Sequence, residues 1–242
     1  GIGPTQVDPR TGEILDADIG IDPVRIRNRR AAHADLMGES KTADADTLCP
    51  QTYLCLREDF AAQEEGFALD LMEARGDMEP GSAAEQQFIL DDLKDVVMHE
   101  VGHTLGLTHN FRASTIYTRA ELDDPAFTRT HGIAGSVMEY TEINIAMKGE
   151  RQGSFSMATL GPYAHWAIEY GYKEIPAAEE KAQLARIAAR STEPQLAYAY
   201  DEESALGVDP DANVGDRAND PLAFAQRRIG LANELWERWQ VR

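Results

Sequence analysis

Three of the six histidines of this 242-residue chain fall within HEVGHTLGLTH, residues 99–109. His99 and His103 are four residues apart, so on a helix they share one face and can direct two imidazole nitrogens at one metal ion. Glu100 lies one position from this pair, where its carboxylate can reach a metal-bound water without binding the metal. The motif therefore predicts hydrolytic chemistry at a metal ion.

A turn after this helix can supply a third ligand. Gly106 can adopt left-handed backbone conformations at little steric cost, and such a turn can bring His109 back toward the first two histidines. Three protein ligands with a fourth position open to water are typical of catalytic zinc, whereas structural zinc is closed by four side chains. We therefore expect one catalytic zinc ion held by His99, His103 and His109.

A second motif, GSVMEY at residues 135–140, places Met138 downstream of the third histidine. Taken alone, a methionine in such a segment is most often core filling, because its side chain packs into irregular gaps. Together, however, the two motifs resemble the metzincin clan of zinc endopeptidases, in which a methionine-containing turn follows the third histidine. The resemblance implies that Met138 forms a hydrophobic floor beneath the zinc.

Tyr140 follows Met138 at a spacing similar to that of the astacin and serralysin branches of the clan, where a tyrosine near the zinc stabilises the tetrahedral intermediate. A phenol can do this because its hydroxyl donates a hydrogen bond to a developing oxyanion. The alternative is a half-buried packing residue with its hydroxyl in water. Asn110, directly after the third histidine, departs from the best-known branches. The two motifs look most like a bacterial metzincin domain that occurs within larger exported proteins.

The resemblance implies a zinc-dependent endopeptidase that hydrolyses peptides or proteins through a zinc-activated water, with Glu100 as general base. The expected fold is α+β, in a single catalytic domain over residues 1–242. An upper lobe, about 1–108, would hold a small mixed sheet and the active-site helix, and a mainly helical lower lobe would span about 109–242. Two alternatives stay open: a metzincin-like binding or targeting module with little turnover, and a zinc hydrolase of a non-peptide amide.

The amino-acid composition limits the classes of molecule that this chain is expected to bind. A hydrophobic fraction of 43% indicates a globular protein, and a net charge of −19 argues against a nucleic-acid partner, because phosphates would be repelled. The sequence contains no apolar run of about 18 residues, so it predicts no membrane span. No signal peptide is evident and the first residue is Gly1, so we expect a processed product or one domain of a larger polypeptide, exported to the periplasm or the extracellular space.

The two cysteines, Cys49 and Cys55, enclose the five residues PQTYL. We expect them to close a small disulfide ring in an oxidising compartment, with two free, packed thiols as the alternative.

An acidic segment precedes the last expected helix. Its Asp209-x-Asp211-x-Asn213 start resembles a calcium loop, but the glycine falls one place late and Asp220 stands where a glutamate is expected. We favour a turn-rich loop that caps the following helix, with calcium as the alternative.

Hydrophobic periodicity and turn signals place the remaining elements. A strand is expected over 13–21, and helices are expected over 23–37, 58–75, 84–105, 157–170, 179–190 and 221–239. The 157–170 helix should end at Gly171 and carry His165 as a surface or packing residue rather than a zinc ligand. The 23–37 helix carries Arg25, Arg27, Arg29 and Arg30, which form a solvated face or, alternatively, a binding patch.

Overall fold

A computed structural model describes residues 5–20 and 53–239 of the chain. The helix expected over 23–37 with its arginines, and the disulfide expected between Cys49 and Cys55, fall outside the described residues and side chains.

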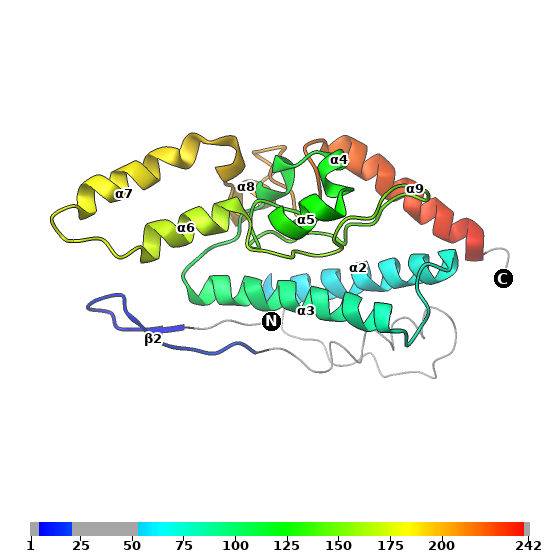
Figure 1. Cartoon of the computed structure of the whole chain (residues 1–242), viewed down its shortest axis with the longest axis horizontal. Coiled ribbons are helices and arrows are strands. Elements are labelled where there is room, and N and C mark those ends of the chain that lie inside the picture. Colours follow the sequence, from blue (N-terminus) through cyan, green and yellow to red (C-terminus); the bar gives the residue numbers. More distant parts are fainter. Residues whose placement is uncertain (1–4, 21–52, 240–242) are drawn as a thin grey trace.

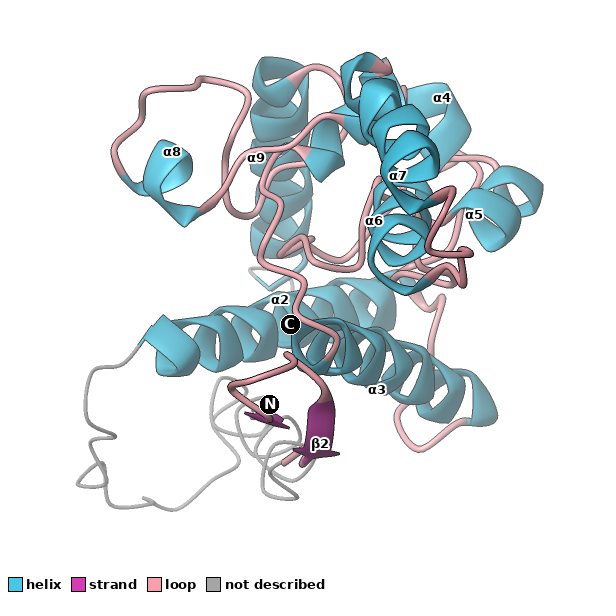
Figure 2. Cartoon of the chain, turned by 90° about the vertical axis from the view of Figure 1, so that its left-hand side faces the viewer, coloured by secondary structure: helices cyan, strands magenta, loops and turns pink. Residues whose placement is uncertain are grey.

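Two long helices, α2 (Tyr53–Arg75) and α3 (Ala83–Thr104), lie side by side and form one layer of the molecule (Figures 1 and 2). Ser82 begins α3, because its hydroxyl accepts a hydrogen bond from the Glu85 amide at 3.2 Å. Leu71 and Met72 of α2 and Phe88 of α3 belong to one buried cluster. Both helices were predicted, although α2 begins five residues earlier than expected.

The remaining helices form a second layer over α2 and α3 (Figures 1 and 2). The longest, α9 (Pro221–Trp239), has the predicted bounds and packs on α2, where Arg75 binds Glu234 at 2.7 Å. The shorter elements are the 3-10 helix Ala113–Ile116, α4 (Arg119–Leu122), α5 (Pro125–His131), α6 (Pro162–Tyr172), α7 (Glu180–Ala188), the 3-10 helices Ala189–Thr192 and Pro194–Leu196, and α8 (Asp201–Ala205).

The sheet of the described residues is a two-stranded antiparallel hairpin. Strand β1 (Thr5–Val7) pairs with β2 (Ile14–Ala17) in the register Thr5 with Ala17 and Gln6 with Asp16. The predicted strand over 13–21 is therefore shorter, and within 5–20 and 53–239 the pairing is antiparallel rather than mixed. Helices with a small sheet give the α+β class that was expected. The division into lobes at residues 108 and 109 stays a prediction.

The helix predicted over 157–170 begins later and ends later, and Gly171 lies inside α6 rather than at its end. The cause lies at Gly161, which adopts φ +83°, and at Pro162, which is favoured in the first turn of a helix. Residues before Gly161 serve other contacts instead: the Leu160 carbonyl accepts a hydrogen bond from the Val137 amide at 3.0 Å. The 157–160 segment thus supports the methionine turn rather than a helix.

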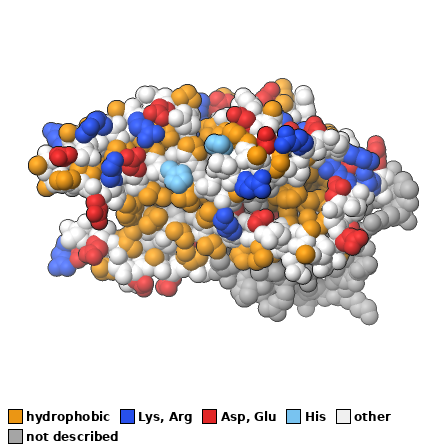
Figure 3. All heavy atoms as spheres, in the orientation of Figure 1, with side chains coloured by type: hydrophobic (Ala, Val, Ile, Leu, Met, Phe, Trp, Pro, Cys, Tyr) orange, Lys and Arg blue, Asp and Glu red, His pale blue; other side chains and the backbone are white. Residues whose placement is uncertain are grey.

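Apolar side chains gather over α3 on the face shown in Figure 3. Leu90 and Val101, both on α3, are 56% and 38% exposed. Within the described residues, no helix combines the length and the apolar character needed to cross a membrane.

Candidate metal centre

The three histidines of the motif meet at the end of α3. His99 and His103 lie on the helix, and a turn at Gly106, with φ +85°, returns the chain so that His109 faces them. One ring nitrogen from each histidine falls in a group whose members all lie within 4.8 Å of one another. The predicted role of Gly106 is confirmed.

Hydrogen bonds fix which nitrogen of each ring faces this group. The Nδ1 atoms of His99 and His103 lie 2.6 Å and 3.0 Å from the carbonyl oxygens of Val137 and Leu107. Because a carbonyl oxygen only accepts, each Nδ1 carries the ring proton and each Nε2 presents a lone pair. These two Nε2 atoms are 3.0 Å apart. Two lone pairs at this distance fit a cation that binds both, so the donor set suits a zinc ion.

His109 is held on both sides of its ring. Its Nδ1 lies 2.9 Å from Oδ1 of Asp201, and its Nε2 lies 2.7 Å from the hydroxyl of Tyr140. Since the carboxylate accepts the Nδ1 proton, the phenol donates to Nε2. The Tyr140 hydroxyl therefore occupies the nitrogen that faces the other two histidines.

Tyr140 lies beside the third histidine, with its hydroxyl 2.7 Å from Nε2 of His109. Its ring contacts those of His109 and Phe111, with centroids 4.6 Å and 5.1 Å away. Glu100 follows His99 on α3 and is only 3% exposed. The catalytic roles assigned to Tyr140 and Glu100 stay predictions.

Met138 lies directly against the helix that carries the histidine pair. Its side chain is fully buried, and a Cβ placed on Gly102 would lie 2.3 Å from its sulfur. Gly102 stands next to His103, so only a residue without a side chain lets the methionine approach the helix here. The Met138 carbonyl also accepts a hydrogen bond from the Asn110 amide at 3.1 Å. The predicted role of Met138 as a hydrophobic floor beneath the zinc stays a prediction.

Asn110, the departure from the better-known pattern, has a clear structural function. Its side chain is fully buried; Nδ2 donates to the Ala197 carbonyl at 3.0 Å and Oδ1 accepts from the Ala199 amide at 3.2 Å. These bonds hold residues 197–199 alongside the third histidine, and Asp201 follows two residues later. Sequence reasoning did not find Asp201, because 92 residues separate it from His109 and no fixed spacing marks it.

A second polar group lies behind the methionine turn, and we call it the Arg217 cluster: Arg217, Glu139, Glu142 and Asp216. Burial raises the pKa values of Glu139 and Asp216, raises that of Glu142 to about 8 and lowers that of Arg217 to about 10. Each shift has desolvation as its largest cause. Arg217 is fully buried, and among the described residues its guanidinium nitrogens have no hydrogen-bond partner.

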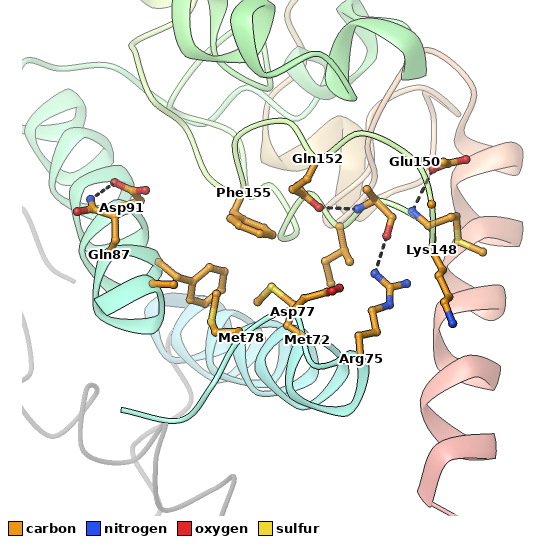
Figure 4. A pocket seen from close by; sticks show the side chains of 16 residues that line it. Met72, Arg75, Asp77, Met78, Gln87, Asp91, Lys148, Glu150, Gln152 and Phe155 are labelled. Atoms are coloured by element: carbon orange, nitrogen blue, oxygen red, sulfur yellow. Dashed lines mark hydrogen bonds between the residues drawn. The ribbon is translucent and has the colours of Figure 1, made fainter. Parts of the chain in front are cut away.

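Two cavities differ in their relation to the histidines. A cavity of about 440 Å³ is lined by His103 and His109 together with Leu107, Thr108, Tyr200, Asp201, Glu202 and Ala205. A larger one, of about 590 Å³, lies at the other end of α3 (Figure 4). Its lining mixes apolar side chains such as Met78 and Phe155 with charged and polar ones, and Arg75 donates to the Ala146 carbonyl at 2.9 Å. The smaller cavity adjoins the metal-facing rings and is the candidate substrate site.

The acidic segment at 209–220 was expected to cap the following helix, and its last residue does so. Asp220 accepts a hydrogen bond from the Ala223 amide at 2.9 Å and so caps α9. The carboxylates of Asp209 and Asp211 pair with Arg112. Calcium binding at this segment stays a prediction.

His165 is exposed on α6 and lies outside the histidine group, as expected.

Comparison with known proteins agrees with this geometry. A protein-family model described as Met-zincin matches residues 81–242, which include α3, all three histidines and the methionine turn. No curated protein and no solved structure shows significant similarity to the chain.

Proposed function

The chain belongs to the Met-zincin family, and on that premise we propose that it is a zinc-dependent endopeptidase. The observation that carries the proposal is the group of three imidazoles, of which two present Nε2 lone pairs 3.0 Å apart. His99, His103 and His109 would hold the ion. Bound zinc would lower the pKa of a coordinated water and polarise the scissile carbonyl.

Glu100 is the proposed general base. Its position on α3, next to His99, and its burial favour a carboxylate that acts at the site rather than one solvated at the surface. It would accept a proton from the attacking water and deliver it to the departing amine, so that one group serves both steps.

Tyr140 is the proposed oxyanion donor. Its hydroxyl already points at Nε2 of His109, at 2.7 Å, so a small displacement of the ring would let it donate to the oxygen of a bound carbonyl. Such a bond strengthens as charge develops on that oxygen, and it therefore lowers the barrier rather than the energy of the bound substrate.

The substrate is proposed to be a peptide or a protein that binds at the cavity beside His103 and His109. Zinc is the only metal in this proposal. We further propose export to the periplasm or the extracellular space, and a larger polypeptide of which this chain is one domain; both rest on the resemblance of the two motifs to exported bacterial metzincins.

The test is a profile of cleavage products from a diverse peptide library, measured with the purified chain, with a chelator, and with zinc restored. We expect internal cleavage that the chelator abolishes and zinc restores. His103→Ala should remove the activity, whereas His165→Ala, which changes an exposed histidine outside the site, should retain it.

Zinc binding without peptide cleavage would contradict the peptidase proposal. Turnover of small amide substrates would then favour a non-peptide amide hydrolase, and its absence would favour a binding module.

A further inference from the structure

His109 is supported differently from the other two histidines. The rings of His99 and His103 donate to main-chain carbonyls of Val137 and Leu107. The ring of His109 instead donates to a side chain, with Nδ1 2.9 Å and 3.1 Å from the two carboxylate oxygens of Asp201. The orientation of the third ring thus depends on a residue from a distant part of the chain.

The segment that carries Asp201 is itself anchored to the histidine segment. Asn110 bonds the main chain at Ala197 and Ala199, and the Phe111 amide donates to the Ala199 carbonyl at 2.8 Å. Between these two alanines, the Tyr198 hydroxyl lies 2.9 Å from that of Thr108, the residue directly before His109. Residues on both sides of His109 therefore fix where Asp201 begins α8.

A carboxylate in this position does two things to an imidazole. It fixes the proton on Nδ1, which leaves Nε2 as the metal-facing lone pair, and its negative charge makes that lone pair a stronger donor than a carbonyl partner would. Partners of this kind are commonly worth 10- to 100-fold in metal affinity.

We propose that Asp201 is a positioning residue for the metal centre: its carboxylate holds the His109 ring so that Nε2 faces His99 and His103, and this sets the zinc affinity of the site. The proposal rests on the proposed zinc function. It assigns no contact with the reacting atoms to Asp201.

The experiment measures zinc affinity by competition with a chromophoric chelator for the wild-type chain, Asp201→Ala and Asp201→Asn. The control is Glu202→Gln, which removes the same charge from the next residue, an exposed side chain that lines the same cavity. Absorption spectra of the cobalt-substituted proteins report the geometry at the metal independently of turnover.

We expect Asp201→Ala to bind zinc about 10- to 100-fold more weakly, with a changed cobalt spectrum. Asp201→Asn should fall between Ala and wild type, because its amide oxygen still accepts from Nδ1. Glu202→Gln should stay within about twofold of wild type. Circular dichroism verifies that each variant is folded, and the Asn variant keeps the test open if Ala does not fold.

Zinc affinities of both Asp201 variants within about twofold of the control, with unchanged cobalt spectra, would overturn the proposal. An equal loss in Glu202→Gln would also overturn it, because the effect would then come from charge in the cavity rather than from the His109 contact. A wild-type chain that binds no zinc contradicts the proposed function instead.

Discussion

The methionine turn, residues 135–140, and the two residues after it contribute to two polar groups that differ in how they are satisfied. On one side, the Val137 carbonyl and the Tyr140 hydroxyl bond ring nitrogens of the histidines. On the other side, Glu139 and Glu142 contribute carboxylates to the Arg217 cluster, where burial shifts pKa values away from their ordinary ranges. One short segment thus contacts the histidine group, whose nitrogens can bind a metal ion, and contributes side chains to the buried Arg217 cluster.

The difference shows that perturbed titration alone does not mark a functional site. Burial displaces pKa values in the Arg217 cluster, yet the lining of the cavity beside His103 and His109 contains no member of it. The histidine group is distinguished instead by geometry: its Nδ1 atoms have partners, and one ring nitrogen of each histidine lies within 4.8 Å of the others. Buried ionisable networks like the Arg217 cluster also occur as structural elements of folded proteins.

Replacing Glu100 tests the metal centre, and it should have the largest effect on peptide cleavage. Glu100→Gln keeps the shape of the side chain and removes the proton acceptor, so peptide cleavage should fall by a factor on the order of 100 or more while zinc stays bound. Initial rates and zinc content of the same preparation measure this. Retained activity with zinc in place would show that another group is the base.

Tyr140→Phe should have a smaller effect on the same side. If the hydroxyl donates only as charge develops, kcat and kcat/KM fall together by about 10- to 100-fold with KM almost unchanged. Tyr170→Phe, at an exposed tyrosine of α6, is the control. A kcat for Tyr140→Phe within about twofold of wild type, with equal zinc content, would assign Tyr140 to packing.

Gly102→Ala tests the contact between Met138 and α3. Alanine normally stabilises a helix relative to glycine, but here the added Cβ would lie 2.3 Å from the Met138 sulfur, so we expect a loss of about 1–2 kcal/mol in unfolding free energy. Gly171→Ala in α6, where a Cβ meets nothing within 4 Å, should be neutral or stabilising. Urea denaturation measures both. Equal effects at the two glycines would contradict the packing described here.

The Arg217 cluster predicts a dependence of stability on pH. The pKa of Glu142 is raised from 4.5 to about 8 in the folded chain, so its contribution is fully present below pH 4.5 and is lost as the pH rises toward 8. Glu142→Gln cannot ionise, so relative to wild type it should gain about 1 kcal/mol or more between pH 5 and 8.5. Glu180→Gln, at an exposed residue of α7, is the control. A difference between Glu142→Gln and wild type that stays constant with pH would contradict the shift.

The part of the metal centre that could be predicted from the sequence depends on the spacing of residues that are close together in the chain. The histidine pair depends on helix periodicity and His109 on a turn at Gly106, and both are properties of adjacent residues. The position of Met138 came from the resemblance to metzincins. Asp201 and the contacts of Asn110 could not be predicted, because they join segments that are far apart in the chain. The burial of Arg217 was equally hidden, since arginine is mostly a surface residue.

Among the helices, those with continuous apolar periodicity were predicted best, as α3 and α9 show. Helix α6 was placed too early because Met157 and Leu160 fit a helical pattern, although they pack against and bond the segment at 132–137. Periodicity identifies which residues are buried but not which neighbour buries them.

The zinc content of the chain, purified at neutral pH without chelator, tests directly whether the three histidines form a metal centre. We expect about one zinc ion per chain, bound more weakly in His109→Ala and released by acid, because the ligating imidazoles must be unprotonated to bind. His165→Ala should leave the content unchanged. If the wild-type chain holds no zinc, even after zinc is added back, the metal centre described here does not exist and the proposed activity fails with it.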